Sequence, residues 1–363
     1  MKLKYKKITV KVGSNVLTKH DGTLNIDRIA HLVEQIDFLH QNGVEVVLVS
    51  SGAVAAGRSE LKVEKKIDPV SSRQLWSAIG QVKLINHYAK LFGDKNIICA
   101  QVLTTKDNFA DRNHYLNMKN CFTTLLENKV VPIVNENDTI SVTELMFTDN
   151  DELSGLIAGM LNSEALIILS NVDGIYDGDP SSSESSIIKE INFKDKEWMN
   201  NITTTKSGFG RGGMLTKSAM ARKVAREGIT VHIACGLKDN ILIDLMNADL
   251  QVSHTVFKPE KHKSSNVKKW ISFSDSFAKG TLIINKGAEE ALHSTRATSL
   301  LLIGVTDVQG TFQKNDIVKI VNEDGKSIGW GKSHFDSKTA EKEMGSKNNK
   351  PIIHYDYLYM NEE

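Results

Sequence analysis

Short runs of apolar, β-branched residues alternate with helical patterns over the first two-thirds of the chain. The run Lys7–Val12 predicts a strand, and Ile26–Gln41 predicts an amphipathic helix because its apolar residues recur every three or four positions. A second helical pattern covers residues 71–92, and further predicted strands cover residues 44–49, 97–103, 130–134, 165–169 and 229–234. This alternation favours an α/β fold with a mostly parallel sheet sandwiched by helices.

The pattern changes after a polar segment at residues 258–268. Beyond it, short apolar runs are separated by turns that contain Gly and Asp, and predicted strands cover residues 280–284, 300–305, 316–321 and 327–331. We therefore expect three parts along the chain. These are an α/β domain over residues 1–257, a linker over residues 258–268, and a small β-rich domain with a polar tail over residues 269–363.

Composition excludes several classes of protein. The 363 residues are 40% hydrophobic and 25% charged, which is ordinary for a globular protein, and a net charge of +1 gives no overall field for nucleic acid or membranes. Cys99, Cys121 and Cys235 show no CxxC spacing, which argues against structural disulfides and a zinc site. Because the chain shows no signal core and no apolar run of about 20 residues, we expect a soluble, cytoplasmic protein.

Two motifs lie at the carboxyl ends of predicted strands, where ligands bind in parallel sheets. Lys11 precedes Gly13 and Ser14, so a cation lies beside a loop of backbone N–H donors. Alternatively, Lys11 belongs to an edge strand and reaches solvent. Ser51 and Gly52 begin a stretch of small residues that could form an anion-binding turn at a helix start. The alternative is a tight turn with close packing.

Two further segments are rich in Asn and Asp. One runs from Asn135 to Asp138 after a predicted strand, and the other contains Asp149, Asn150 and Asp151 at the start of a helical pattern. Asp149 or Asn150 could simply cap that helix. Together the segments offer carboxylates and amides to an amino group, a lysine or a metal. An EF-hand is excluded because the alternating oxygen ligands and the closing Glu are missing.

A glycine-rich run at residues 208–217 ends in Lys217 and precedes a helical pattern. It is not a Walker loop, because Met-Leu-Thr precedes the lysine, and it is either a phosphate-binding loop or a solvated flexible loop. Two lysines, one carboxylate and many N–H donors are the groups that phosphoryl transfer requires. None of the five motifs contains His or Cys, which suits a carboxylate acceptor that is already anionic at neutral pH.

In this order and spacing, the five motifs resemble those of the glutamate 5-kinases, within the amino acid kinase family. The resemblance covers nearly the whole chain and rests on residues 10–14, 49–57, 134–138, 149–151 and 210–217. It implies ATP-dependent phosphorylation of the side-chain carboxylate of L-glutamate to L-glutamyl 5-phosphate, the first step of proline biosynthesis. It also implies Mg²⁺, feedback inhibition by proline, and a homo-oligomer that is a dimer or a tetramer.

The resemblance assigns a role to individual residues. Lys11 and Lys217 would stabilise the phosphates and the transferring phosphoryl group, and Asp151 would orient both lysines. The expected glutamate-binding residues are Ser51, Gly52, Asn135, Asp138 and Asn150, with Asp138 pairing with the α-amino group. The expected ATP-binding residues are Lys11, Ser170, Asn171, Arg211, Gly212, Gly213, Met214, Leu215, Thr216 and Lys217. No protein residue is assigned as a metal ligand.

The chain departs from the family at two nucleotide-contacting positions. Asn171 stands where the family commonly has Asp, and Arg211 stands where it has Thr. Neither residue belongs to the proposed lysine–aspartate group, so the departures bear on nucleotide contacts alone. Arg211 either adds a phosphate contact or is solvated.

The C-terminal part resembles a PUA domain. The resemblance rests on Trp270 and on residues 280–288, 301–305 and 310–312. PUA domains elsewhere bind RNA, yet the residues from 260 onward include 15 basic and 14 acidic side chains, which gives no basic stripe. We therefore expect a structural or regulatory role. An RNA-binding protein with an inert kinase-like part is the alternative from another functional class.

Overall fold

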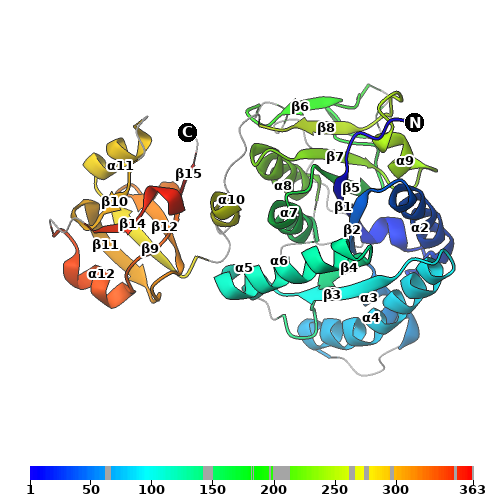
Figure 1. Ribbon diagram of the computed structural model, residues 1–363, viewed down its shortest axis with the longest axis horizontal. Helices are drawn as coiled ribbons and strands as arrows, with labels where there is room; N and C mark the ends of the chain where they lie inside the picture. Colours follow the sequence, from blue (N-terminus) through cyan, green and yellow to red (C-terminus); the bar gives the residue numbers. More distant parts are fainter. Residues whose placement is uncertain are drawn as a thin grey trace. The chain divides into compact units, whose positions relative to one another are not determined.

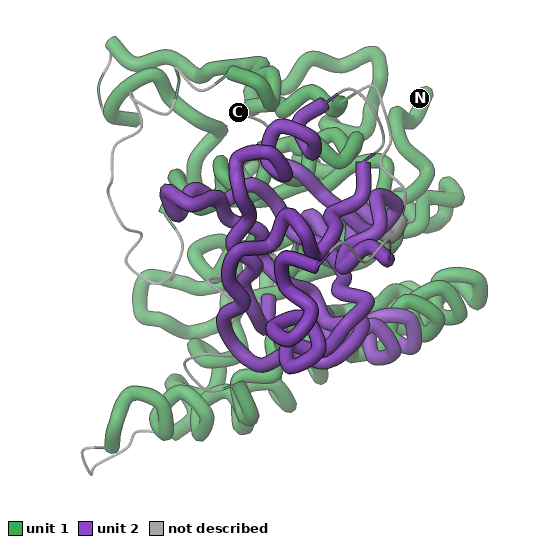
Figure 2. Tube along the Cα trace, turned by 90° about the vertical axis from the view of Figure 1, so that its left-hand side faces the viewer, with its two compact units in different colours: residues 1–105, 118–263 green, residues 106–117, 264–363 purple. Residues whose placement is uncertain are grey.

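The chain contains two compact units, shown in different colours in Figure 2. Unit 1 comprises residues 1–105 and 118–263, and unit 2 comprises residues 106–117 and 264–363. The computed structural model describes residues 1–61, 67–141, 150–180, 182, 184–195, 198, 213–260, 266–273, 278–294, 298–346 and 350–361. The expected domain boundaries at residues 257 and 269 remain a prediction.

Unit 1 is built on an eight-stranded sheet with the order β3-β4-β2-β1-β5-β7-β8-β6 (Figure 1). Neighbouring strands from β3 to β7 are parallel, whereas β8 runs antiparallel to β7 and pairs in parallel with β6. The strands are β1 Lys7–Val12, β2 Glu45–Ser50, β3 Cys99–Thr104, β4 Val131–Glu136, β5 Ala165–Ser170, β6 Glu190–Asn192, β7 Thr230–Cys235 and β8 Thr255–Lys258. The predicted α/β class with a mostly parallel sheet is confirmed.

Helices cover both faces of this sheet. On one face α2 packs against β2, α4 and α9, and on the other α7 packs against β1 and β5 while α8 packs against β7. The helices are α1 Ser14–Leu17, α2 Ile26–Gln41, α3 Ala53–Glu60, α4 Pro69–Gly93, α6 Arg112–Glu127, α7 Asn150–Leu161, α8 Met214–Arg226 and α9 Ile241–Met246. Of α6, residues 112–117 belong to unit 2 and the remainder to unit 1.

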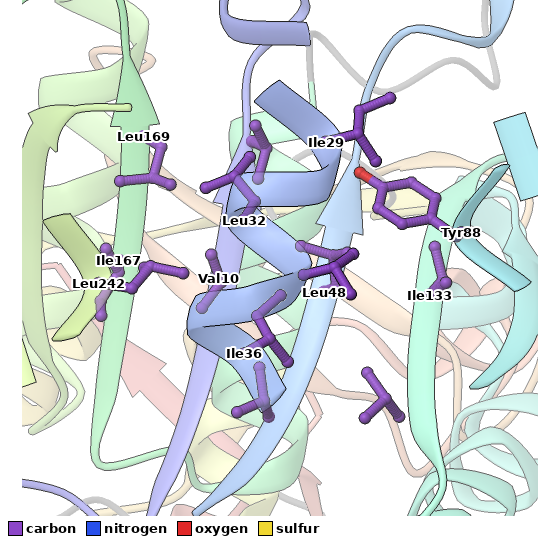
Figure 3. Packing of buried hydrophobic residues seen from close by; sticks show 14 of the residues in the cluster. Val10, Ile29, Leu32, Ile36, Leu48, Tyr88, Ile133, Ile167, Leu169 and Leu242 are labelled. Atoms are coloured by element: carbon purple, nitrogen blue, oxygen red, sulfur yellow. The ribbon is translucent and has the colours of Figure 1, made fainter. Parts of the chain in front are cut away.

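One hydrophobic core of unit 1 lies between the sheet and α2 (Figure 3). It contains Val10, Leu48, Ile133, Ile167 and Leu169 from the strands, Ile29, Leu32 and Ile36 from α2, Tyr88 from α4 and Leu242 from α9. Side chains alternate along a strand. Because Ile8, Val10 and Val12 of β1 enter this core, Thr9 and Lys11 must point to the opposite face, toward α7. The alternation of β1 therefore places one lysine on the face of the sheet that α7 covers.

Helix α4 shows how local signals fix an element. The predicted helix at residues 71–92 corresponds to α4, which begins two residues earlier because Pro69 occupies its first position. Asp68 caps it, since its Oδ1 accepts hydrogen bonds from the backbone N–H groups of Val70 (3.0 Å) and Ser71 (2.9 Å). The predicted strand at residues 7–12 and helix at residues 26–41 match β1 and α2 without any shift.

Helices α3 and α4 touch backbone to backbone at two glycines. A Cβ atom on Gly57 would lie 1.8 Å from the carbonyl oxygen of Trp76, and one on Gly80 would lie 1.7 Å from that of Ala53. Neither position has room for a methyl group. Close packing therefore accounts for Gly57, the last glycine of the small-residue motif that follows β2.

Unit 2 contains a five-stranded sheet with the order β11-β9-β12-β13-β15 and a separate β10–β14 pair. Its strands are β9 Gly280–Ile284, β10 Leu300–Leu301, β11 Val305–Gly310, β12 Ile317–Asn322, β13 Ser327–Lys332, β14 Pro351–Ile353 and β15 Leu358–Met360. Its helices are α5 Lys106–Ala110, α10 Asn266–Ser272, α11 Lys286–His293 and α12 Ser337–Glu343, with the start of α6. The predicted strand at residues 300–305 is wrong as a single element, because a 3₁₀ turn at Leu302–Gly304 separates β10 from β11.

Candidate functional site

Lys11 and Lys217 meet on one buried carboxylate, that of Asp151. Lys11 Nζ lies 2.6 Å from Asp151 Oδ1, and Lys217 Nζ lies 2.8 Å from Asp151 Oδ2. The side chains of Lys11, Lys217 and Asp151 are 5%, 14% and 0% exposed. Three residues that are distant in the sequence thus form one bridged group.

Secondary structure positions each member of this lysine–aspartate bridge. Lys11 lies next to the end of β1, which pairs with β2 on one side and β5 on the other, so the edge-strand alternative is wrong. Asp151 lies in the first turn of α7, where the helix dipole favours a negative charge. Lys217 lies in the first turn and a half of α8. The bridge therefore joins the sheet to the starts of two helices.

The two ammonium groups keep Asp151 ionised. Burial alone would raise the pKa of this carboxyl, but the charges of Lys11 and Lys217 and their hydrogen bonds outweigh it and hold the pKa at about 2. At neutral pH the group thus carries two positive charges and one negative charge. The surplus positive charge suits a site for an anion.

A second, polar group surrounds Asn150. Its Nδ2 donates hydrogen bonds to Ser51 Oγ at 2.8 Å and to Asn135 Oδ1 at 3.1 Å. Ser51 follows β2 and Asn135 belongs to β4, so this group lies at the carboxyl ends of two strands. Asn135 also lines a small cavity between α4 and strands β2, β3 and β4. Because Asn150 directly precedes Asp151, the two groups are neighbours.

Gly52 is explained by its backbone. Its φ of 104° lies in the left-handed region, and it precedes the first residue of α3. A Cβ atom there would also come within 3.3 Å of Leu24 Cδ2. The tight-turn alternative therefore accounts for the glycine by itself, and a contact with substrate remains a prediction.

Asp138 is paired with an arginine that the sequence analysis missed. Arg73 of α4 donates to Asp138 Oδ1 through Nε at 2.7 Å and Nη2 at 2.5 Å, and Ser77 Oγ donates to Oδ2 at 3.4 Å. Arg73 Nη2 also lies 3.6 Å from Glu136 Oε2. The available signal was the spacing of Arg73, Ser77 and Gln81, three polar residues that recur every four positions on the largely buried face of a helix.

The expected ATP-binding positions lie at two element ends. Ser170 ends β5, is 6% exposed, and donates from Oγ to Asn171 Oδ1 at 3.4 Å. Gly213 precedes α8 without a side-chain cap, and Met214, Leu215, Thr216 and Lys217 are the first four residues of that helix. A helix start that carries a lysine suits polyphosphate. Arg211, Gly212 and the rest of the glycine run before Gly213 lie outside the described residues.

The described residues show neither a metal-binding cluster nor a membrane-spanning helix. They contain no group of three or more His, Cys, Asp or Glu side chains placed to hold a metal ion. Within the described ranges, every helix is too short or too polar to cross a membrane.

Comparison with known proteins identifies the family. Residues 6–235 match the amino acid kinase family, and residues 280–355 match the PUA domain. The chain belongs to the amino acid kinase family. This amino acid kinase is 56% identical to the glutamate 5-kinase of Bacteroides thetaiotaomicron over 99% of this chain and 100% of that protein. It is 50% identical to the glutamate 5-kinase of Chlorobaculum tepidum over 98% of both chains.

A solved structure supports the fold of this amino acid kinase. The carbamate kinase from Giardia lamblia bound to AMP-PNP matches 71% of this chain and 99% of its own with a TM-score of 0.51. Its sequence identity of 17% makes this a likeness of fold alone. The predicted resemblance to glutamate 5-kinases with a C-terminal PUA domain is confirmed by the relatives and the two matched families.

Proposed function

We propose that this chain transfers the γ-phosphoryl group of ATP to the side-chain carboxylate of L-glutamate and so forms L-glutamyl 5-phosphate. Two relatives named glutamate 5-kinase, 56% and 50% identical over nearly the full chain, support this assignment. The observation that carries the chemistry is the bridge of Lys11 and Lys217 through Asp151. By the resemblance, the product opens proline biosynthesis.

The reaction needs positive charge and alignment more than proton transfer. A glutamate carboxylate oxygen attacks the γ-phosphorus, the bond from phosphorus to the bridging oxygen breaks, and ADP leaves with that electron pair. Lys11 and Lys217 would stabilise the charge on the phosphates and on the moving group. Because the acceptor carboxylate is ionised at neutral pH, no general base is required. This agrees with the absence of His and Cys from the five motifs.

Asp151 is a positioning residue in this scheme. Its two carboxylate oxygens each hold one lysine, which fixes the separation of the two ammonium groups before substrate arrives. Its low pKa keeps it ionised under any condition in which the enzyme would work. Preorganised charge of this kind avoids reorganisation during the reaction.

We assign glutamate to the polar group beside the bridge. Ser51, Asn135 and Asn150 supply a hydroxyl and two amides, which can donate to a carboxylate or accept from an amine. Asp138 would pair with the α-amino group of the substrate, and its carboxylate would then interact with both this amine and Arg73. An N-acetylated amine carries no charge, so Asp138 would favour free glutamate over an N-acetylated acceptor.

We assign ATP to the start of α8 and the end of β5, with Lys217 and Lys11 on its phosphates. Mg²⁺ would be held mainly by the phosphates and water, because Mg²⁺ in kinases commonly takes few protein ligands and keeps several waters. Feedback inhibition by proline and a homo-oligomeric state remain predictions from the resemblance.

An acceptor panel tests the proposal. ADP release would be coupled to a spectroscopic readout with glutamate, N-acetylglutamate, aspartate or carbamate as the acceptor, each with and without proline. We expect the highest kcat/KM with glutamate and a decrease with proline. A preference for another acceptor would refute the substrate, and the absence of ADP release with every acceptor would refute the kinase activity.

A further inference from the structure

Two cations of unit 2 approach each other among aromatic rings. Arg112 is the first residue of α6, and its guanidinium carbon lies 5.2 Å from the ring centroid of Tyr115 and 5.0 Å from that of Trp270. Lys332 ends β13, and its Nζ lies 3.8 Å from the ring centroid of Tyr357. Helix α10, which carries Trp270, packs against β13 and against the 3₁₀ turn Tyr355–Tyr357, so the two cations are neighbours. Burial and then the charge of Arg112 lower the pKa of Lys332.

The positive charge of this pair is not balanced within the part of the chain that the structure describes. No described carboxylate lies within ion-pair distance of Arg112 or Lys332, and Arg112 Nη1 is buried without a described hydrogen-bond partner. A buried donor without an acceptor destabilises the fold, and a charged donor does so more strongly. Asp356, a nearby acid, lies 3.4 Å from His354 instead.

The aromatic rings hold the arginine but leave its charge in place. Trp270 is 2% exposed and donates from Nε1 to the backbone oxygen of Phe109 at 2.7 Å, so its ring is fixed, and Tyr115 is 4% exposed. A cation–π contact stabilises a cation but does not neutralise its charge. The arrangement therefore presents two neighbouring cations without a counter-charge among the described residues.

We propose that Arg112 and Lys332 form a binding site for a small anion that carries a phosphate group. The fork of a guanidinium and the point charge of an ammonium both match phosphate oxygens. A small ligand is favoured over a nucleic acid because the 15 basic and 14 acidic side chains from residue 260 onward nearly balance, whereas nucleic acid binding draws on an excess of positive charge. The site lies in unit 2, whereas Lys11, Asp151 and Lys217 lie in unit 1.

Titration of the full-length protein with inorganic phosphate and with pyrophosphate tests this site. Binding would be followed by calorimetry and by tryptophan fluorescence at constant ionic strength, with chloride as the reference anion. We expect saturable binding that Arg112→Gln and Lys332→Gln each weaken about tenfold or more. Lys326→Gln, which removes an exposed charge from the turn before β13, should leave binding unchanged.

Two further variants show which unit binds phosphate and which tryptophan gives the fluorescence change. Lys217→Ala should retain phosphate binding, because that lysine belongs to the proposed ATP site in unit 1. Trp270→Phe should reduce the fluorescence response while the calorimetric signal persists. The proposal is overturned if Lys217→Ala abolishes binding while Arg112→Gln and Lys332→Gln retain it, or if neither anion binds saturably.

Thermal unfolding supplies a readout that does not require a bound ligand. In phosphate-free buffer Lys332→Gln should unfold at a higher temperature than the wild type, because one of two repelling charges is gone, and Lys332→Arg should preserve binding. An unchanged or lower unfolding temperature for Lys332→Gln would remove the basis of the proposal. Arg112-dependent binding of a short single-stranded RNA, without binding of either inorganic anion, would overturn it in favour of nucleic acid.

Discussion

Replacing Asp151 with Asn keeps the size of the side chain and removes the charge that holds two lysines together. Asp151 is fully buried, and its pKa of about 2 lies below the ordinary value of 3.8. This difference corresponds to about 2–3 kcal/mol of unfolding free energy at neutral pH. The variant should lose more than this, because Lys11 and Lys217 would remain nearly buried and face each other without a counterion. Removing one partner of a buried ion pair costs about 3–5 kcal/mol.

The pH dependence of the Asp151→Asn effect has a definite sign. The folded pKa of Asp151 lies below its unfolded value, so its contribution is complete above about pH 4 and is lost as the pH falls from 3.8 towards 2. The variant lacks this contribution at every pH. The difference in unfolding free energy between wild type and variant should therefore be largest at neutral pH and should narrow in acid.

Urea unfolding followed by circular dichroism, with ADP release measured in parallel, tests this reasoning. Asp151→Asn should lose about 3–5 kcal/mol of unfolding free energy at pH 7 and most of its kcat. Adding Lys217→Met to it should recover part of the stability, since only one unpaired ammonium remains, without recovering activity. An unfolding free energy within about 1 kcal/mol of the wild type would refute the bridge as a source of stability.

Four further outcomes are expected. Lys217→Ala should lower kcat by orders of magnitude with a smaller change in the KM for ATP, measured at steady state, because this lysine would act mainly in the transition state. Asn150→Ala should raise the KM for glutamate more than that for ATP, and equal changes would contradict its assignment. Gly57→Ala should lower the unfolding free energy, measured in urea, by about 3 kcal/mol, because the new Cβ atom would meet the backbone of α4. The control Gly93→Ala, whose Cβ atom would enter open space, should change it by no more than about 1 kcal/mol. Burial and a neighbouring histidine lower the pKa of His232 from 6.5 to about 3, so the unfolding free energy should fall as the pH drops from 6.5 towards 3. His232→Phe should lessen that loss by up to about 4 kcal/mol. Parallel curves of unfolding free energy against pH for wild type and variant would contradict this expectation.

The longer elements of the fold could be predicted because their signals are local. Strand β1 and helix α2 have periodic apolar residues and polar neighbours, and both were located without error. Strands β6 and β8 have three and four residues, too few for a periodic pattern. Strand β11 has the sequence VTDVQG, in which four of six positions are exposed, so its apolar signal is weak. Short and solvated strands depend on their neighbours in the sheet, which one sequence does not reveal.

The sequence indicates the individual motifs of the candidate site but not which of their residues contact one another. Each polar motif stood out because it interrupts an apolar run, but contact between Lys11 and Asp151 depends on strand order and on which face of β1 meets α7. The resemblance to a known family supplied that information. Arg73 was missed because it lies within a long helical pattern, where a single charged residue has many explanations. Its pairing with Asp138 emerges only when α4 is placed beside the loop after β4.

The membership of residues 106–117 in unit 2 limits where the chain can be divided. Trp270 donates from Nε1 to the backbone oxygen of Phe109 and packs against Tyr115, so two stretches more than 150 residues apart build one structure. A chain shortened after residue 263 would lose the indole N–H group that this oxygen accepts from and the ring that packs against Tyr115. A fragment meant to fold as unit 1 alone would therefore need a substitute for Trp270 or a change within residues 106–117.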